Sequence, residues 1–201
     1  MNNDFLQGFK FLSFVLTAVL IVVFSLTGPE VQAEDAPIGI YSLDINIDVE
    51  RSTLKGLSRI IVEQGRELLL RTGSLKIRDV SMNNKKLDVT VEKGLLRIIP
   101  PYKGEIQIRY EGRFKSTASR KHLKSGNSEN SIGKRGVSLT GLWYPSPQRL
   151  SYYKLKVKLP EGYEAISEAE TIIKTVKNGS AEFTFTFPYP LFSTLPQPSL
   201  T

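Results

Sequence analysis

The sequence predicts an all-β protein: an antiparallel β-sandwich of about ten short strands, preceded by a cleaved signal peptide. Three observations lead to this fold class. Apolar and polar residues alternate with a period of two in at least five segments. Turn-forming residues separate these segments at intervals of about 8 to 12 residues, the spacing of antiparallel sandwiches and barrels. No stretch before residue 160 has the period of an amphipathic helix.

Residues 1–33 form the predicted signal peptide. Lys10 precedes an apolar run at residues 11–26, and the Val-Gln-Ala sequence ending at Ala33 has the small-residue spacing that signal peptidase needs. As a helix this run reaches only about 24 Å, which is short of the roughly 30 Å hydrocarbon core of a membrane. We therefore expect export by the general secretory route and a periplasmic or secreted location. An uncleaved N-terminal anchor is the alternative.

The strand signals begin at Tyr41. Every apolar side chain of residues 41–50 falls on one face of a half-buried strand. Denser apolar stretches at residues 60–62, 68–70 and 96–99 predict strands that are covered on both faces. Further alternating apolar positions are Leu87, Val89 and Val91; Ile106, Ile108 and Tyr110; Leu155, Val157 and Leu159; and Phe183, Phe185 and Phe187.

Turn signals and proline content divide the rest of the chain. Asn83-Asn84 and Asn178-Gly179 predict two-residue turns between strands. The second also begins a glycosylation acceptor, Asn-Gly-Ser, but we favour the turn. The β-sandwich domain is expected over residues 34–190. Residues 191–201 form a proline-rich tail that cannot donate a regular hydrogen-bond ladder.

Residues 113–135 interrupt the domain with a predicted basic, flexible loop. The segment carries seven Lys or Arg against one Glu and shows no periodicity. Such a loop can bind an anionic membrane surface or an acidic protein by charge attraction, although we favour a solvated insertion. Export argues against nucleic acid as a natural partner. The candidate anion-binding residues are Arg113, Lys115, Arg120, Lys121, Lys124, Lys134 and Arg135.

The composition excludes much catalytic chemistry. The chain has 27 Lys and Arg, 20 Asp and Glu, no cysteine and a single histidine, His122. Zinc fingers, thiol nucleophiles and disulfides are therefore excluded, and most metalloenzyme sites are hard to build. Acidic residues at positions 44–50 share a strand face, where they lie in a line rather than in the curled loop that calcium requires. We expect no catalytic residue, no metal site and no cofactor.

A group of aromatic residues is the other candidate interaction surface. Trp143, the only tryptophan, and Tyr144 lie close in sequence to Tyr152 and Tyr153, with Pro145 and Pro147 between them. Aromatic side chains beside prolines can form a platform for sugars or peptides. They can equally close one end of a sandwich core or pack at a domain interface, and we favour packing.

The order of these patterns resembles the N-terminal β-domain of the M1 metallopeptidases, the aminopeptidase N and leukotriene A4 hydrolase group. The resemblance covers about residues 38–190. It implies a β-sandwich of the kind that precedes a catalytic zinc domain in that family. The matching residues are Tyr41, Leu43, Ile45 and Gly56; Leu68, Leu70, Leu75, Ile77 and Val80; Ile106, Ile108, Tyr110 and Gly112; Trp143, Tyr144 and Pro145; and Tyr153 to Leu159 with Pro160 and Gly162.

The sequence departs from that family in its catalytic motifs. The His-Glu-x-x-His and Gly-x-Met-Glu-Asn motifs are both missing, and Trp143 to Pro147 replaces the acidic segment of many members. We therefore expect a non-catalytic module, truncated or stand-alone, that serves interaction or domain packing. One alternative is part of a zinc aminopeptidase whose catalytic half lies elsewhere. Another is an envelope module that binds a ligand through the basic loop or the aromatic group.

Overall fold

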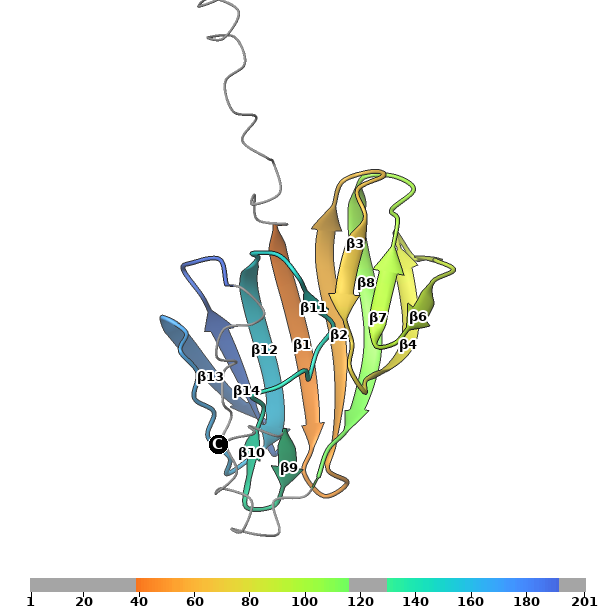
Figure 1. The fold of residues 1–201 in the computed structure, drawn as a ribbon. Coiled ribbons are helices and arrows are strands. Elements are labelled where there is room, and N and C mark those ends of the chain that lie inside the picture. The colour runs from red at the N-terminus through yellow and green to blue at the C-terminus, as the bar shows by residue number, and fades with distance from the viewer. Residues whose placement is uncertain (1–38, 116–129, 192–201) are drawn as a thin grey trace, which may run out of the picture. The chain divides into compact units, whose positions relative to one another are not determined.

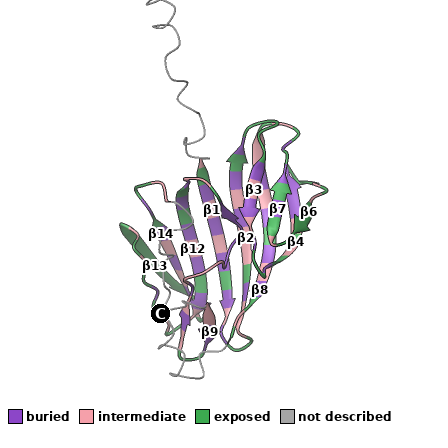
Figure 2. Ribbon diagram, viewed as in Figure 1, coloured by how far each residue is buried: buried purple, intermediate pink, exposed green. Residues whose placement is uncertain are grey.

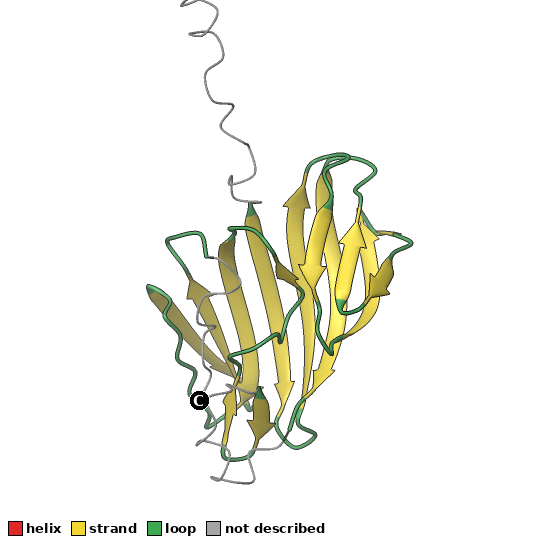
Figure 3. Cartoon of the chain, in the orientation of Figure 1, coloured by secondary structure: helices red, strands yellow, loops and turns green. Residues whose placement is uncertain are grey.

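The computed structural model describes residues 39–115 and 130–191, and every regular element in these two ranges is a β-strand (Figures 1 and 3). The predicted all-β class is therefore confirmed for these residues. Fourteen strands are present in the described ranges, more than the ten expected. Several contain only two to four residues, too few for an alternating pattern to reveal them. The predicted signal peptide and residues 192–201 lie outside the described ranges.

The largest layer is an eight-stranded sheet with the order β13-β14-β12-β1-β2-β8-β4-β5. Neighbouring strands are antiparallel except β1 and β12, which run parallel with Ile40 opposite Tyr152. The purely antiparallel expectation was wrong at this pair, because alternation reports the buried face of a strand and not the direction of its neighbour. The bounds are β13 (Thr171–Lys177), β14 (Ser180–Thr186), β12 (Tyr152–Pro160), β1 (Ile40–Asp48), β2 (Thr53–Val62), β8 (Gly104–Arg113), β4 (Lys76–Met82) and β5 (Lys85–Lys86).

Smaller sheets form the second layer of the sandwich. One has the order β11-β3-β7-β6, and the other pairs β10 with β9. Buried side chains of both join the same hydrophobic cluster as the eight-stranded sheet. The bounds are β11 (Ser146–Pro147), β3 (Leu68–Arg71), β7 (Leu95–Ile98), β6 (Thr90–Glu92), β9 (Ser131–Gly133) and β10 (Gly136–Ser138).

The core follows the predicted period of two. In β1 the side chains of Tyr41, Leu43, Ile45 and Ile47 are at most 3% exposed. The residues between them point to the other side of the sheet, which gives the banded burial pattern along the strands in Figure 2. Each fully buried aliphatic or aromatic side chain of this kind contributes roughly 1.5–3 kcal/mol. We call the side of the eight-stranded sheet that faces away from this core the open face.

Two of the three denser apolar stretches, residues 60–62 and 96–99, are covered on one side only, which corrects the expectation of two-sided cover. Ile61 of β2 is 46% exposed, and Ile99, just after β7, is 64% exposed. The strand expected around residues 87–91 is also broken, since β5 ends at Lys86 and β6 begins at Thr90. Adjacent apolar residues in these segments report strand propensity rather than burial on both faces.

The turns at two predicted positions have left-handed backbone. Asn83 and Asn84 have φ values of 49° and 63°, and Asn178 and Gly179 have φ values of 52° and 68°. Two successive residues with positive φ are the mark of the hairpin turn whose twist matches that of the flanking strands. The turn interpretation of Asn178-Gly179 is therefore confirmed.

The segment predicted as one long loop contains part of the second layer. β8 continues to Arg113, and Lys115 forms a bridge with Ser131 of β9. The backbone N–H of Ile132 donates to the carbonyl of Lys115 at 3.1 Å, and the Ile132 side chain is fully buried. The described ends of the 113–135 segment thus lie side by side, while residues 116–129 fall outside the described ranges. Within residues 39–115 and 130–191 there is no helix that could span a membrane.

Candidate functional site

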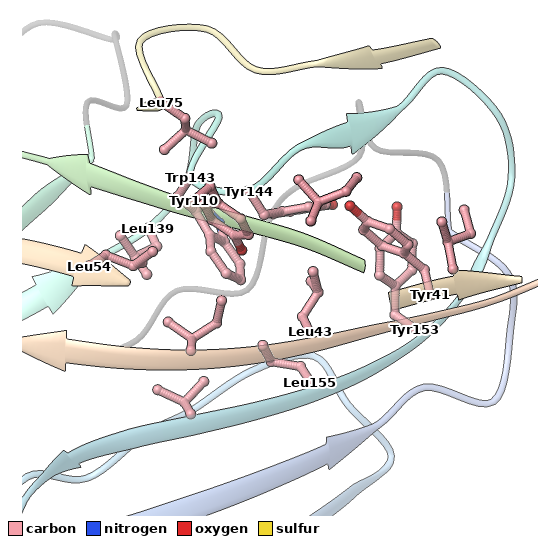
Figure 4. Close-up of a cluster of buried hydrophobic side chains, with 14 of the residues drawn as sticks. Tyr41, Leu43, Leu54, Leu75, Tyr110, Leu139, Trp143, Tyr144, Tyr153 and Leu155 are labelled. Carbon is pink, nitrogen blue, oxygen red and sulfur yellow. The ribbon is translucent and has the colours of Figure 1, made fainter. Parts of the chain in front are cut away.

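The predicted aromatic group lies mainly inside the core. Trp143 is fully buried, and Tyr144 and Tyr153 are 4% and 6% exposed. Tyr41 of β1, which the sequence did not place here, joins them with its ring centroid 5.6 Å from that of Tyr153 (Figure 4). The centroids of Trp143 and Tyr144 are 4.7 Å apart in an edge-on arrangement. Trp143, Tyr144 and Tyr153 therefore pack in the core, as the favoured interpretation of the aromatic group expects.

A hydrogen bond joins this aromatic group to the segment just before β11. The hydroxyl of Tyr41 donates to the carbonyl of Pro145. Burial raises the pKa of Tyr41, Tyr110 and Tyr153 above the ordinary tyrosine value, because an ionised phenolate would lose its hydration inside the core. These hydroxyls therefore stay protonated at neutral pH, and that of Tyr41 acts as a structural hydrogen-bond donor.

Tyr152 differs from its aromatic neighbours because it lies on the open face. Its side chain is 41% exposed, and it stands directly opposite Ile40, which is 60% exposed. Ile61 on β2 is a further exposed apolar residue of the same face. Of the four aromatic residues proposed from the sequence, Tyr152 is the one whose ring can contact a partner directly.

The described cations of the basic loop are exposed and lie near one end of the sandwich. Arg113 is the last residue of β8, and Lys115 forms the bridge to β9. Lys134 and Arg135 form the turn between β9 and β10. The Lys134 ammonium lies 2.8 Å from the carboxylate of Glu50, and this hydrogen bond raises the pKa of Lys134. The remaining predicted cations, Arg120, Lys121 and Lys124, fall outside the described residues.

The open face contains a hollow of about 610 Å³ that the sequence did not predict. Its volume lies within the range of small-molecule sites. Side chains from six neighbouring strands line it, because every second side chain of each strand points to this face. The charged and amide side chains around it are Asp44, Asn46, Lys55, Arg78, Arg109, Glu111, Lys156, Lys158 and Glu182.

The acidic side chains of the hollow are held by basic ones. Asp44 pairs with Arg59 at 2.5 Å, and Glu182 pairs with Lys156 at 3.3 Å. Glu111 pairs with Arg78, and this hydrogen bond lowers the pKa of the Glu111 carboxyl. Each carboxylate of the hollow is thus paired with a neighbouring cation.

Two lysines stand at the centre of this arrangement. Lys55 of β2 and Lys158 of β12 both lie opposite Asn46, one on each side of β1. Two strand spacings separate their backbones by roughly 10 Å, a distance that two long side chains can bridge by converging on one ligand. Further along the same row, Lys158 faces Glu182 and Lys55 faces Glu111. The row can therefore offer two ammonium groups and an amide to an anionic group placed over Asn46.

The sequence contained both halves of this surface without showing that they meet. The acidic face of residues 44–50 and the lysines of residues 154–158 belong to strands far apart in the chain. The parallel pairing of β1 with β12 puts Asp44 opposite Lys156 and Asn46 opposite Lys158. No signal within either strand identifies the other as its neighbour.

The described residues do not contain a group of three or more His, Cys, Asp or Glu side chains that could hold a metal ion. His122 falls outside those residues. The carboxylates of the hollow are spread along separate strands, and each forms an ion pair with Arg or Lys.

Comparison with solved structures finds this fold within an M1 zinc metallopeptidase. A mutant of the enzyme from Deinococcus radiodurans matches with a TM-score of 0.61 and 14% identity, covering 78% of this chain and 40% of the enzyme chain. The mutant bound to a Tyr-Ser-Ala substrate matches with a TM-score of 0.61, 15% identity and the same coverage. A two-domain M1 metallopeptidase bound to L-tryptophan also matches, with a TM-score of 0.61 and 13% identity.

These matches confirm the resemblance to the N-terminal β-domain of the M1 family at the level of fold. The chain spans about 40% of the length of the metallopeptidases that it matches. At sequence level, neither a family model nor a curated protein matches. The shared feature is therefore the arrangement of strands.

Proposed function

We propose that this chain is a non-catalytic, exported β-sandwich module that acts by packing against another protein, either a catalytic peptidase domain or another envelope protein. The observation that carries the proposal is the coverage of the structural match. The fold extends over 78% of this chain but only 40% of the metallopeptidase chain. In this proposal the protein corresponds to the β-domain of such an enzyme, and any catalytic residues belong to the partner protein.

The distribution of side chains supports a binding role rather than chemistry. The tyrosine hydroxyls of the aromatic group are buried and protonated, and the carboxylates of the hollow are ion-paired. Hydrolysis by a zinc peptidase needs three protein ligands for the metal, an open position for water and a carboxylate to accept a proton. Exposed apolar and charged residues on the open face, such as Tyr152 and Lys158, instead provide contact area for a partner.

Metal analysis and an activity assay test this proposal together. The full chain, dialysed and analysed for zinc, is expected to hold far less than one zinc per molecule and to release no product from aminoacyl-amide substrates. Near-stoichiometric zinc with turnover that a chelator abolishes would refute the proposal. If the neighbouring reading frame encodes His-Glu-x-x-His, mixing its product with this chain tests the split-peptidase alternative, which requires activity from the mixture alone.

A second candidate function is binding of an anionic ligand in the hollow of the open face. The placement of Lys55 and Lys158 on either side of Asn46 favours it. Titration with a carboxylated or phosphorylated sugar, followed by NMR shifts of the Asn46 side-chain amide, would detect such binding. Lys55→Gln combined with Lys158→Gln is expected to abolish the shifts, whereas Lys103→Gln, on an exposed lysine away from the hollow, leaves them unchanged. Equal shifts in both variants would rule this function out.

A further inference from the structure

The edges of the two larger sheets differ in how well they are protected against pairing with another chain. β5 is only two residues long and consists of Lys85 and Lys86. β11 is also two residues long and contains Pro147, and β6 has three residues. Short strands, lysines and proline are the usual means by which an edge is made unsuitable for pairing. Three of the four edges are therefore blunted.

β13 is the exception. It has seven residues, contains no proline, and pairs with β14 over its whole length without a change of register. Every one of its residues is exposed, including Ile172 at 44%, Ile173 at 58% and Val176 at 49%. A long, regular edge strand with exposed β-branched apolar residues is a template for a further strand.

The backbone of β13 offers a regular set of hydrogen-bonding groups at this edge. The two-residue turn makes Lys177 and Ser180 the closing pair of the β13–β14 hairpin. In such a hairpin the closing pair and every second pair exchange hydrogen bonds, so the odd-numbered peptide groups of β13 face β14. The N–H and C=O groups of Ile172, Lys174 and Val176 are consequently directed toward the free edge.

We propose that β13 pairs antiparallel with β13 of a second copy of this chain, joining the two eight-stranded sheets into one continuous sheet. A two-fold interface requires a surface that is complementary to itself. The side chains of β13 on the open face read Thr171, Ile173 and Thr175, which is symmetric about Ile173. Pairing centred on this residue places Ile173 opposite itself and each Thr171 opposite the partner's Thr175.

This register satisfies both the backbone and the side chains. Ile172 and Lys174, whose peptide groups face the edge, become a hydrogen-bonded pair, and Ile173 becomes a non-hydrogen-bonded pair with side chains in close contact. Thr–Thr and β-branched pairs are favourable across strands. No two lysines stand directly opposite each other.

Lys174 is the residue most able to oppose this pairing by charge repulsion, because the Lys174 side chains of the two copies lie near the two-fold axis. Its ammonium group forms an ion pair with Glu164 and lies 5.4 Å from the centre of the Phe183 ring of its own subunit. The charge is thereby neutralised and directed over the core side of the same molecule. A register centred on Lys174 would instead place the two lysines face to face.

Cysteine cross-linking of the full chain tests the proposal, because the native sequence contains no cysteine to interfere. Ile173→Cys places the two thiols opposite each other in a non-hydrogen-bonded pair, where Cα atoms lie about 4.5 Å apart, within disulfide range. Mild oxidation at low protein concentration is expected to convert this variant from monomer to disulfide-linked dimer on a non-reducing gel. Ile40→Cys is the matched control, since Ile40 is 60% exposed and lies on a different strand.

Two further variants test the register. Thr171→Cys and Thr175→Cys should each remain monomeric when oxidised alone, because identical positions then lie four residues out of register, about 13 Å apart. A mixture of the two should form the cross-linked dimer. Absence of cross-linking by Ile173→Cys, or cross-linking of Ile40→Cys to the same extent, would overturn the proposal. Cross-linking of Ile173→Cys only when mixed with Thr175→Cys would also overturn it, because that result indicates the register centred on Lys174.

Discussion

The ring of Tyr110 lies across the backbone of Gly56 on the core side of the eight-stranded sheet. The two residues are directly opposite each other in the β2–β8 pair. A Cβ atom at position 56 would lie 2.7 Å from Cε1 of Tyr110, and Cζ and Oη would be nearer still. The missing side chain of Gly56 thus provides the space that the buried ring fills, a glycine–aromatic pairing known to stabilise strands that contain glycine.

Gly56→Ala is expected to destabilise the protein by about 1–3 kcal/mol, since the new methyl group forces the Tyr110 ring out of its packed position. Urea unfolding monitored by tryptophan fluorescence measures the change. In a Tyr110→Leu background the same substitution should cost much less, because the atoms that it meets are gone. Equal costs in both backgrounds would show that the ring does not determine the need for glycine.

Buried tyrosines predict a loss of stability at alkaline pH. Burial raises the pKa of Tyr41, Tyr110 and Tyr153 in the folded state, whereas unfolding returns each to about 10. Their contribution is therefore complete below pH 10, and above it the free energy of unfolding falls by about 1.4 kcal/mol per pH unit for each tyrosine that ionises only on unfolding. Urea midpoints measured from pH 8 to 11 check this slope.

Tyr41→Phe provides the control for the alkaline transition. The substitution removes the hydrogen bond to the carbonyl of Pro145 and lowers stability at neutral pH by about 1 kcal/mol. It also removes one of the three ionising groups, so the decline above pH 10 becomes shallower. The part of the tyrosinate absorbance that comes from the three buried hydroxyls should rise together with unfolding. Ionisation of all tyrosines in the folded protein, before unfolding, would contradict the predicted burial of these hydroxyls.

The strands that bury one face could be predicted from the sequence because alternation is a local property. The apolar residues from Tyr41 to Ile47 and from Phe183 to Phe187 follow it, and they are buried as expected. β13 could not be recognised in this way. Ile172 and Ile173 are adjacent, so its apolar residues occupy both faces, and every residue of the strand is exposed. It is the hairpin with β14 that makes this segment a strand.

The hollow could not be predicted because it depends on which strands become neighbours. Lys158 and Asn46 are opposite each other only through the parallel pairing of β1 with β12. Trp143 is a different case. Its sequence context allowed both packing and binding, and the structure shows the side chain fully buried against Tyr144. Long-range pairing and cover by a second layer are properties of the whole fold that a single strand does not encode.

Export predicts a specific mature N-terminus. If signal peptidase cleaves after Ala33, the mature chain begins at Glu34 and carries 26 basic and 18 acidic residues, a net charge of +8. Intact-mass measurement of protein recovered from the exported fraction identifies this species directly. Ala33→Asp should block cleavage, because the peptidase requires a small residue there. A wild-type chain that retains Met1 and stays in the membrane would instead establish the anchored alternative.

The basic segment offers a test that separates folding from surface binding. Its composition contains almost no apolar residues between positions 117 and 128, and a shorter connection costs less closure entropy. Replacing those residues with a short Gly-Ser linker is therefore expected to leave the melting temperature nearly unchanged. Ile132→Ala, by contrast, empties a buried position at the end of the same segment and should cost about 2–5 kcal/mol.

The same pair of variants tests the membrane-surface interpretation of the loop. The linker variant lacks Arg120, Lys121 and Lys124 but keeps Lys134, which is paired with Glu50. If the loop binds anionic lipid, sedimentation with vesicles that contain phosphatidylglycerol should show binding by the native chain, weakened by salt and lost in the linker variant. Ile132→Ala retains all of these cations and, while folded, should bind as the native chain does. Equal vesicle binding by the native chain and the linker variant would show that another surface attracts the lipid. The candidate is then the open face around Lys158, which also carries lysines.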